Sequence, residues 1–265
     1  MGKLSSIFTF TGSVGDITAY KVRGSDEIII RKKGGPSKEL IKNSPAFSVV
    51  RRRNAEFGGL SAMTRWLTLA LLPVKPIINY NIVNKMHRFL RHILELDTVS
   101  EFGQRAIRLS AEPGLLTGLQ LNEKTPFGNV ISASVSSTIS RENRSSKVVI
   151  PVLVPRLNMT MPGQQPFFSI IISLGIVPDL FFTERGYKPS KEAYDQFAAK
   201  SATTPWALCS ETFPGATLEV TLPDAPPDEH YTLMLCIGIR YGVNSMNPLP
   251  QEVSRVGFGE VLMMA

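Results

Sequence analysis

Residues 31–59 read RKKGGPSKELIKNSPAFSVVRRRNAEFGG, and the rest of the chain is organised around this stretch. The run Gly34-Gly35-Pro36 ends a β-rich pattern, because proline has no amide hydrogen for a strand ladder. Ser44 followed by Pro45 is typical of a helix start, with serine as the cap and proline at the first helical position. The stretch therefore predicts a junction between a strand-rich head and a long helix.

The head upstream of this junction carries short β-rich runs separated by glycine-containing turns. The pattern predicts strands over residues 7–11, 17–22 and 27–31, joined as antiparallel hairpins. A flap of this size is marginal in water by itself. We therefore expect it to pack on the rest of the chain or on a neighbouring subunit.

Downstream of the junction, apolar residues recur at three- and four-residue steps from Phe47 to Leu71. This spacing predicts a helix over residues 45–72 with one buried face. Gly58 and Gly59 interrupt the pattern and mark a kink, a close helix contact or a break into two helices. Ser37 is expected to cap a short turn over residues 38–42, and further helices are expected over residues 81–96 and 98–108.

Helical periodicity stops at Pro113-Gly114, and period-two patterns follow. Strands are predicted over residues 115–121, 129–137, 148–154, 167–176, 207–213, 217–222, 231–241 and 257–264. A polar insert over residues 183–204 is expected to hold a short helix at residues 190–199. Eight short strands with turn clusters between them predict an antiparallel, immunoglobulin-like β-sandwich. We therefore expect an α+β fold, with a basic strand-plus-helix region at residues 1–112 and the sandwich at residues 113–265.

Charge is distributed unevenly along this chain of 265 residues and net charge +7. Residues 1–109 hold 18 Lys and Arg and 8 Asp and Glu, whereas residues 110–265 hold 11 and 14. The basic part of one copy can thus meet the acidic part of another, or it can contact nucleic acid. The residues predicted to make such a subunit or polyanion contact are Arg31, Lys32, Lys33, Arg51, Arg52 and Arg53. For the last three, a solvated helix face is the alternative.

The sequence carries no recognised catalytic, phosphate-binding or zinc motif, so we predict a non-enzymatic protein without a cofactor. His87 and His92 are five residues apart and do not share a helix face, which excludes the usual i, i+4 metal pair. Asp224, Asp228 and Glu229 beside His230 form either a solvated turn or a metal site, and the turn is favoured.

Two cysteines, Cys209 and Cys236, are too few for a disulfide framework. They form either a single bridge or two buried thiols on neighbouring strands. The first residues, MGKLSSIFTFTG, lack the apolar centre of a signal peptide, and no apolar run is long enough to span a membrane. The chain is therefore expected in the cytoplasm or in an assembled particle.

Four segments of the first half resemble an uncharacterised Bacteroidota protein family. They are residues 12–18 (GSVGDIT), 33–38 (KGGPSK), 45–47 (PAF) and 53–58 (RNAEFG). In that family a short β-segment precedes the pattern K-G-G-x-S-K…F…R-x-N-x-x-E-F, then helices and a β-rich C-terminal part; here the last element has shorter spacing. The resemblance implies this layout and supplies no catalytic residue.

Together these features favour a structural, self-assembling subunit of a homopolymeric filament, tube or phage-tail-like particle. The opposite charges of the two parts and the small head are the main reasons. A nucleic-acid-binding protein that uses the basic region is the alternative. A carbohydrate-binding module is a third hypothesis, with Trp206, Tyr231 and Tyr241 as its only candidate aromatic row.

Overall fold

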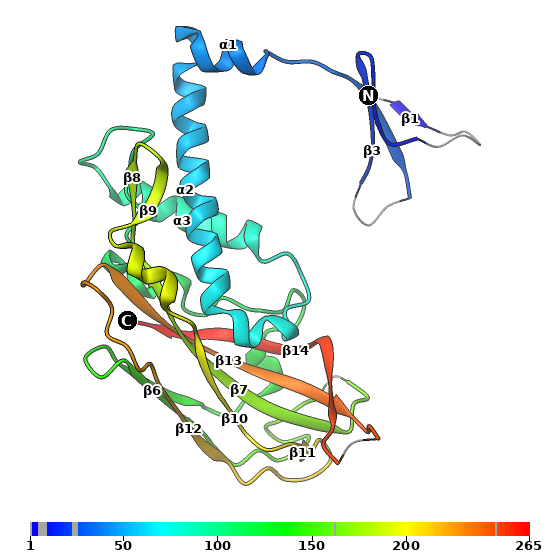
Figure 1. The fold of residues 1–265 in the computed structure, drawn as a ribbon. Helices are drawn as coiled ribbons and strands as arrows, with labels where there is room; N and C mark the ends of the chain where they lie inside the picture. Colours follow the sequence, from blue (N-terminus) through cyan, green and yellow to red (C-terminus); the bar gives the residue numbers. More distant parts are fainter. Residues whose placement is uncertain (1, 5–9, 23–25, 162, 247) are drawn as a thin grey trace. The chain divides into compact units, whose positions relative to one another are not determined.

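A computed structural model describes residues 2–4, 10–22, 26–161, 163–246 and 248–265. The fold is α+β, as predicted, with helices and several antiparallel sheets (Figure 1). The chain divides into two compact units, Met1–Arg51 and Arg52–Ala265, which are described separately. Among the described residues, none of the helices combines the length and apolar character needed to cross a membrane.

The first unit contains a four-stranded antiparallel sheet with the order β1-β4-β3-β2. Its strands are β1 (Gly2–Leu4), β2 (Gly12–Val14), β3 (Ile17–Lys21) and β4 (Ile28–Lys32). The predicted strands at 17–22 and 27–31 are confirmed. The prediction over residues 7–11 falls mostly outside the described residues, and residues 10 and 11 belong to no strand.

The junction has the predicted turns, with one difference in capping. In α1 (Lys38–Asn43) the Ser37 hydroxyl accepts a hydrogen bond from the amide of Leu40 at 3.1 Å, which confirms the predicted cap. A 3₁₀ turn, η1 (Pro45–Phe47), then begins with Pro45 at its first position, but the Ser44 side chain makes no capping bond. The turn before the long helix therefore has a proline at its first position but no serine cap.

The second unit begins in α2 (Ser48–Ala70), which continues through η2 (Leu72–Ile77) to α3 (Val83–Leu96). The predicted helices over residues 45–72 and 81–96 are confirmed. The glycine pair does not break α2. A Cβ atom at Gly59 would lie 2.8 Å from the Tyr187 ring, so this glycine permits a close helix contact. Part of the predicted buried stripe is wrong, because Val50 and Phe57 are exposed.

The helix predicted over residues 98–108 is wrong. Its backbone amides bond instead to the buried Asp97 carboxylate, which accepts from Val99, Ser100 and Ala106 at 2.7–3.1 Å. A side chain that binds nearby amides competes with helical hydrogen bonding. Residues 97–108 therefore form an irregular loop tied to the end of α3.

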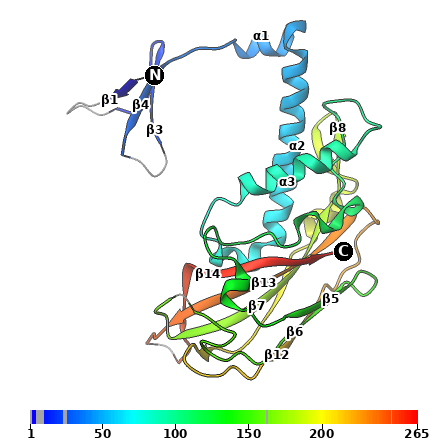
Figure 2. The ribbon, with the colours of Figure 1, turned by 180° about the vertical axis from the view of Figure 1, so that it is seen from behind.

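Two antiparallel sheets hold most of the strands of the second unit. The five-stranded sheet has the order β10 (Lys200–Thr203), β7 (Phe167–Pro178), β13 (Tyr231–Val243), β14 (Gln251–Met264), and β11 (Ala207–Leu208) also pairs with β7. The three-stranded sheet has the order β12 (Ala216–Thr221), β6 (Ser145–Ile150), β5 (Ser136–Ser140). Helices lie on one side of the larger sheet and the smaller sheet on the other (Figures 1 and 2). This double cover explains why β7 is almost continuously apolar and buried.

Small residues let the helical layer approach the larger sheet. A Cβ atom at Gly175 would lie 2.6 Å from the Cβ of Ala70, and the Ser173 hydroxyl donates to the Ala70 carbonyl at 3.2 Å. Farther across the sheet, Gly257 and Gly259 leave room for the buried side chain of Ile77. The contact between α2–η2 and the sheet thus depends on residues without bulky side chains.

Several predicted strands are wrong or shorter than expected. Residues 115–121 overlap η4 (Pro113–Leu116), and their later amides and carbonyls bond to the edge of β14 without forming a strand. Most of 129–137 is irregular after α4 (Phe127–Val130), and only two residues of 207–213 are in β11. A further 3₁₀ turn, η3 (Leu109–Ala111), precedes η4.

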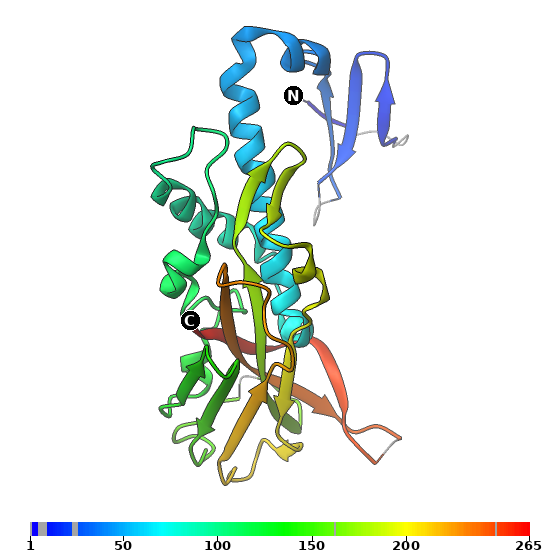
Figure 3. The same ribbon diagram turned by 60° about the vertical axis from the view of Figure 1, so that its left-hand side comes forward.

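The insert over residues 183–204 holds more strand than expected. A hairpin of β8 (Leu180–Thr183) and β9 (Gly186–Pro189) rises beside α2 (Figure 3), and β10 joins the larger sheet. The predicted helix at 190–199 is limited to the 3₁₀ turn η5 (Glu192–Gln196).

The compact units differ from the domains 1–112 and 113–265 expected from the sequence. Buried residues of α2 and α3, such as Leu67 and Leu90, belong to the same hydrophobic core as Ile172 and Leu235 in the sheet. The change from helical to strand periodicity at Pro113 therefore occurs inside one packed unit.

Candidate functional site

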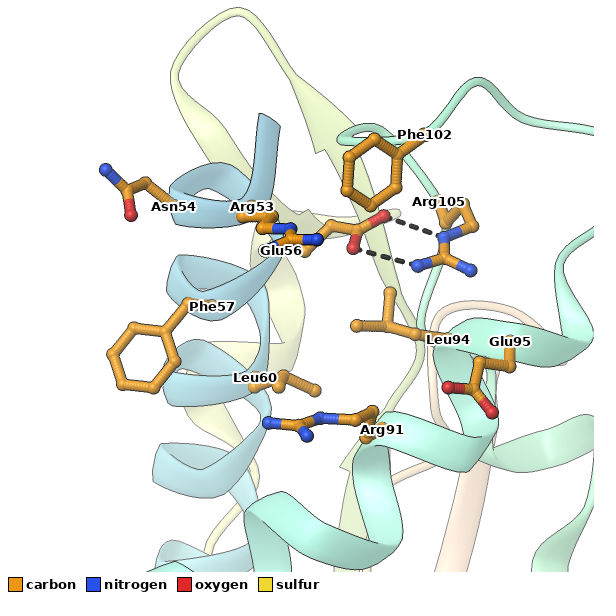
Figure 4. Close-up of a pocket in the computed structure, with 10 residues that line it drawn as sticks. All are labelled: Arg53, Asn54, Glu56, Phe57, Leu60, Arg91, Leu94, Glu95, Phe102 and Arg105. Carbon is orange, nitrogen blue, oxygen red and sulfur yellow. Dashed lines mark hydrogen bonds and ion pairs between the residues drawn. The ribbon is translucent and has the colours of Figure 1, made fainter. Parts of the chain in front are cut away.

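A pocket of about 560 Å³ lies between α2, α3 and the loop that follows α3 (Figure 4). Apart from one asparagine, its lining consists of arginines, carboxylates, aromatic rings and buried leucines. The lining residues are Arg53, Asn54, Glu56, Phe57, Leu60, Arg91, Leu94, Glu95, Phe102 and Arg105. The volume falls within the range of small-molecule sites, about 300–1,000 Å³.

Helical spacing explains why α2 supplies so many of these residues. Arg53 precedes Glu56 and Phe57 by three and four positions, and Leu60 follows them by four and three, which are spacings that place residues on one side of a helix. In Figure 4 the Arg91 side chain extends from α3 towards α2 across this opening. The two helices therefore present guanidinium groups to one pocket from different sides.

A buried ion pair forms the polar wall of the pocket. Arg105 binds Glu56 in a bidentate manner, with Nε 2.7 Å from Oε1 and Nη2 2.9 Å from Oε2. The amide of Gly103 donates a third bond to Glu56 Oε1 at 3.0 Å. Burial alone would raise the pKa of Glu56, but these hydrogen bonds outweigh it and hold the pKa below its ordinary value of 4.5. Glu56 is thus ionised and fully engaged at neutral pH.

Tyr187 of β9 holds Arg105 in place from behind. Its hydroxyl donates to the Arg105 carbonyl at 2.9 Å, and its ring lies against Gly59 of α2. Burial, assisted by the negative charge of Glu56, raises the pKa of Tyr187 to about 12. The phenol is therefore protonated and acts as a donor over the physiological pH range.

The remaining arginines of the pocket carry positive charge without a partner. Among the residues that the structure describes, neither Arg53 nor Arg91 makes a hydrogen bond or ion pair, and both are exposed. Glu95 is the second carboxylate of the pocket; it is 59% exposed and lies 3.8 Å from His92. The pocket thus combines three guanidinium groups with two carboxylates.

His87 lies beside the pocket and is held neutral. Its ring packs edge-on against Phe57, with ring centroids 5.3 Å apart, and its Nε2 is buried without a hydrogen-bond partner. Burial and the nearby charge of Arg91 lower the pKa of His87. It therefore adds no positive charge to the pocket at neutral pH.

The structure does not bring the six predicted contact residues together in one site. Arg31 and Lys32 lie at the end of β4, Lys33 follows them, and all three are exposed. Only Arg53 lines the pocket, whereas Arg52 is exposed on the same helix.

Arg51 has a local structural contact. Its Nη1 donates to the carbonyls of Ile41 and Ser44 at 2.7 and 2.8 Å, so it ties α2 to the turn before it.

Glu56, Arg91 and Arg105 were missed by sequence reasoning. The sequence does indicate that Glu56 is buried, because it lies at three- and four-residue steps from the buried Leu60, Met63 and Leu67 of α2. A carboxylate at such a position requires a buried cationic or donor partner. That partner, 49 residues farther along the chain, is fixed only by the fold.

Local contacts describe the acidic turn beside His230, which was the other candidate metal site. The Asp228 carboxylate accepts bonds from the Tyr194 and Ser190 hydroxyls and from the amide of His230. In the described part of the chain, no group of three or more His, Cys, Asp or Glu is placed to hold a metal ion.

Of the proposed aromatic row, Tyr231 and Tyr241 are buried, which argues against an exposed carbohydrate platform.

The two cysteines are both free. Cys236 is buried in β13, while Cys209 follows β11 on the far side of β7, so the expected neighbouring strands are not adjacent. Burial raises the pKa of both thiols, that of Cys209 to about 11. Neither thiol is a reactive thiolate at neutral pH.

Comparisons with protein-family models, curated proteins and solved structures found no match.

Proposed function

We propose that this chain is a structural, self-assembling subunit of a homopolymeric filament, tube or phage-tail-like particle. In this proposal the basic N-terminal unit docks on a neighbouring subunit, and the two facing sheets form an immunoglobulin-like β-sandwich body. The observation that carries the proposal is the small core of the unit Met1–Arg51.

Only two apolar side chains described in this unit, Ala19 and Ile28, are buried. Burying a side chain the size of isoleucine contributes about 1.5–3 kcal/mol, whereas ordering each residue of backbone costs about 1–2 kcal/mol. Val14 and Ile17, which are paired directly across the β2–β3 hairpin, remain 67% and 46% exposed. The sheet therefore presents apolar surface whose burial on a partner would stabilise it.

The pairing pattern supplies a second means of attachment. Among the described strands, β2 pairs on one side only, with β3, so its other edge is open to strand addition. A contact in which the head of one copy meets a different surface of the next is heterologous, and such contacts build rings or open filaments.

The test is the state of association of purified protein at low salt, measured by light scattering and negative-stain microscopy. We expect polymers from the native chain and their loss in Val14→Asp, because a carboxylate on this face opposes its burial. Ser13→Asp is the matched control, since Ser13 is on the opposite face of the same strand and is exposed. A native chain that stays monomeric at high concentration, or equal effects of the two variants, would refute the proposal.

Nucleic-acid binding is a second candidate function, favoured by the exposed run Arg31, Lys32 and Lys33. The Arg31 guanidinium lies 5.5 Å from the centre of the Tyr20 ring, which places a cation beside an aromatic surface on one face of the sheet. Binding should weaken steeply with salt, and each phosphate contact removed by Lys32→Gln or Lys33→Gln should reduce the log–log salt slope by about 0.9. Salt-insensitive or absent gel shifts would reject this candidate.

A further inference from the structure

The pocket between α2 and α3 has one positive charge more than its own carboxylates balance. Arg105 is neutralised by Glu56, which is buried and bonded through both oxygens. Glu95, which lies 3.8 Å from His92, is the second carboxylate of the lining and bonds to neither Arg53 nor Arg91. The three arginines and two carboxylates of the lining therefore sum to a net charge of +1.

The floor of the same pocket is apolar. Leu60 and Leu94 are 4% and 1% exposed, and the rings of Phe57 and Phe102 stand at the border with 58% and 37% exposure. Exposed aromatic rings beside arginines are typical of surfaces that bind partners or ligands. An occupant that suits this lining has one anionic group and an apolar body.

We propose that the pocket recognises a monocarboxylate on an apolar carrier, with Arg53 and Arg91 binding the carboxylate and Leu60 and Leu94 contacting the carrier. A guanidinium group offers paired donors that match a carboxylate. A single negative charge balances the pocket, whereas a dianionic phosphate would leave excess negative charge beside Glu95. The carrier is either a small free acid or a side chain of another protein chain. The proposal does not depend on self-assembly.

The probe is hexanoate, titrated into the full-length chain and followed by NMR, with hexanamide as its neutral analogue. Hexanoate should bind saturably and hexanamide at least about tenfold more weakly, because a hydrogen bond to a charged group contributes more than a neutral one. Inorganic phosphate, which has no apolar body, should also bind more weakly than hexanoate. Absence of saturable hexanoate binding, or equal binding of the amide, would overturn the proposal.

Two variants locate the site. Arg53→Gln and Arg91→Gln should each weaken hexanoate binding by about tenfold or more, since each removes a charged donor. Arg88→Gln is the matched control, an exposed arginine on α3 that does not line the pocket. Because all three arginines are exposed, the variants should fold with unchanged melting temperatures. Equal losses in the control and the pocket variants would place the binding elsewhere and refute the assignment.

A further measurement identifies the source of the carboxylate. If a carboxylate of another copy occupies the pocket, hexanoate should disperse any assembled protein in sedimentation velocity, and Arg91→Gln should do the same. If the natural occupant is a free acid, hexanoate should bind without changing the state of association. Either result is consistent with carboxylate binding in the pocket. The NMR titration with hexanoate and hexanamide tests whether the pocket binds a carboxylate at all.

Discussion

The Glu56–Arg105 pair gives the sharpest test of the architecture, through the substitution Glu56→Gln. The two side chains are 9% and 21% exposed, so the pair is shielded from water. A glutamine can still accept at one oxygen, but its amide group would face the Nη2 donor of Arg105. The change removes a charge-assisted bond and leaves a half-buried guanidinium unpaired. We expect the free energy of unfolding to fall by about 2–4 kcal/mol at pH 7.

The pH dependence of this loss has a definite sign. The pKa of Glu56 is lower in the folded protein than its ordinary value of 4.5. The folded state therefore favours the ionised form of this carboxyl group. Its contribution is fully present above that ordinary value and is lost as the pH falls through the lower, folded pKa. The difference in unfolding free energy between native protein and Glu56→Gln should therefore be constant near neutrality and shrink below about pH 4.5.

Urea unfolding followed by tryptophan fluorescence is the suitable assay. The two tryptophans, Trp66 and Trp206, both belong to the unit Arg52–Ala265, so the signal reports on the unit that contains the pair. Glu95→Gln is the control: it removes an exposed carboxylate from the same pocket and should change stability by less than about 0.5 kcal/mol. Equal losses in the two variants, or a loss in Glu56→Gln that does not vary with acid pH, would refute the reasoning.

Three further predictions concern packing and redox state. Gly59→Ala should lower the free energy of unfolding by about 1–3 kcal/mol in the same urea assay, because the new Cβ would meet the Tyr187 ring. Gly58→Ala has open space around it and should raise the free energy of unfolding by about 0.4–1 kcal/mol. Gly175→Ala should lower the melting temperature, since the new Cβ would lie 2.7 Å from the Cα of Ala70, and backbone cannot move aside cheaply. A reducing agent should leave the melting temperature unchanged, because both cysteines are free; a drop would indicate a disulfide.

Elements with a strong local signal were predictable from the sequence. The continuous apolar run that became β7 and the three- and four-residue spacing of α2 are patterns that tertiary contacts reinforce. The loop after α3 is different. Its sequence predicts a helix, but the Asp97 carboxylate accepts hydrogen bonds from its backbone amides instead. The irregular loop thus depends on the burial of one carboxylate.

Long-range contacts explain the rest of the differences. Phe57 continues the apolar spacing of α2 but stays exposed, while Glu56 beside it is buried because Arg105 arrives from a distant loop. The strands β8 and β9 have only four residues each, which is too short for a clear period-two pattern, and Tyr187 of β9 packs against Gly59 of α2. The candidate pocket combines these contacts, so only one of its arginines, Arg53, could be nominated in advance.

The three consecutive arginines of α2 show why a charge run by itself does not define a binding surface. Successive residues of a helix point about 100° apart, so identical neighbours meet different surroundings. Arg51 donates to two backbone carbonyls of the preceding turn, and the Cα and Cβ of Arg52 lie against Gly103, where positive φ and lack of space both require glycine. Arg53 alone enters the pocket. We therefore propose Arg31, Lys32 and Lys33 for a polyanion that needs several adjacent cations, and Arg53 with Arg91 for a single carboxylate.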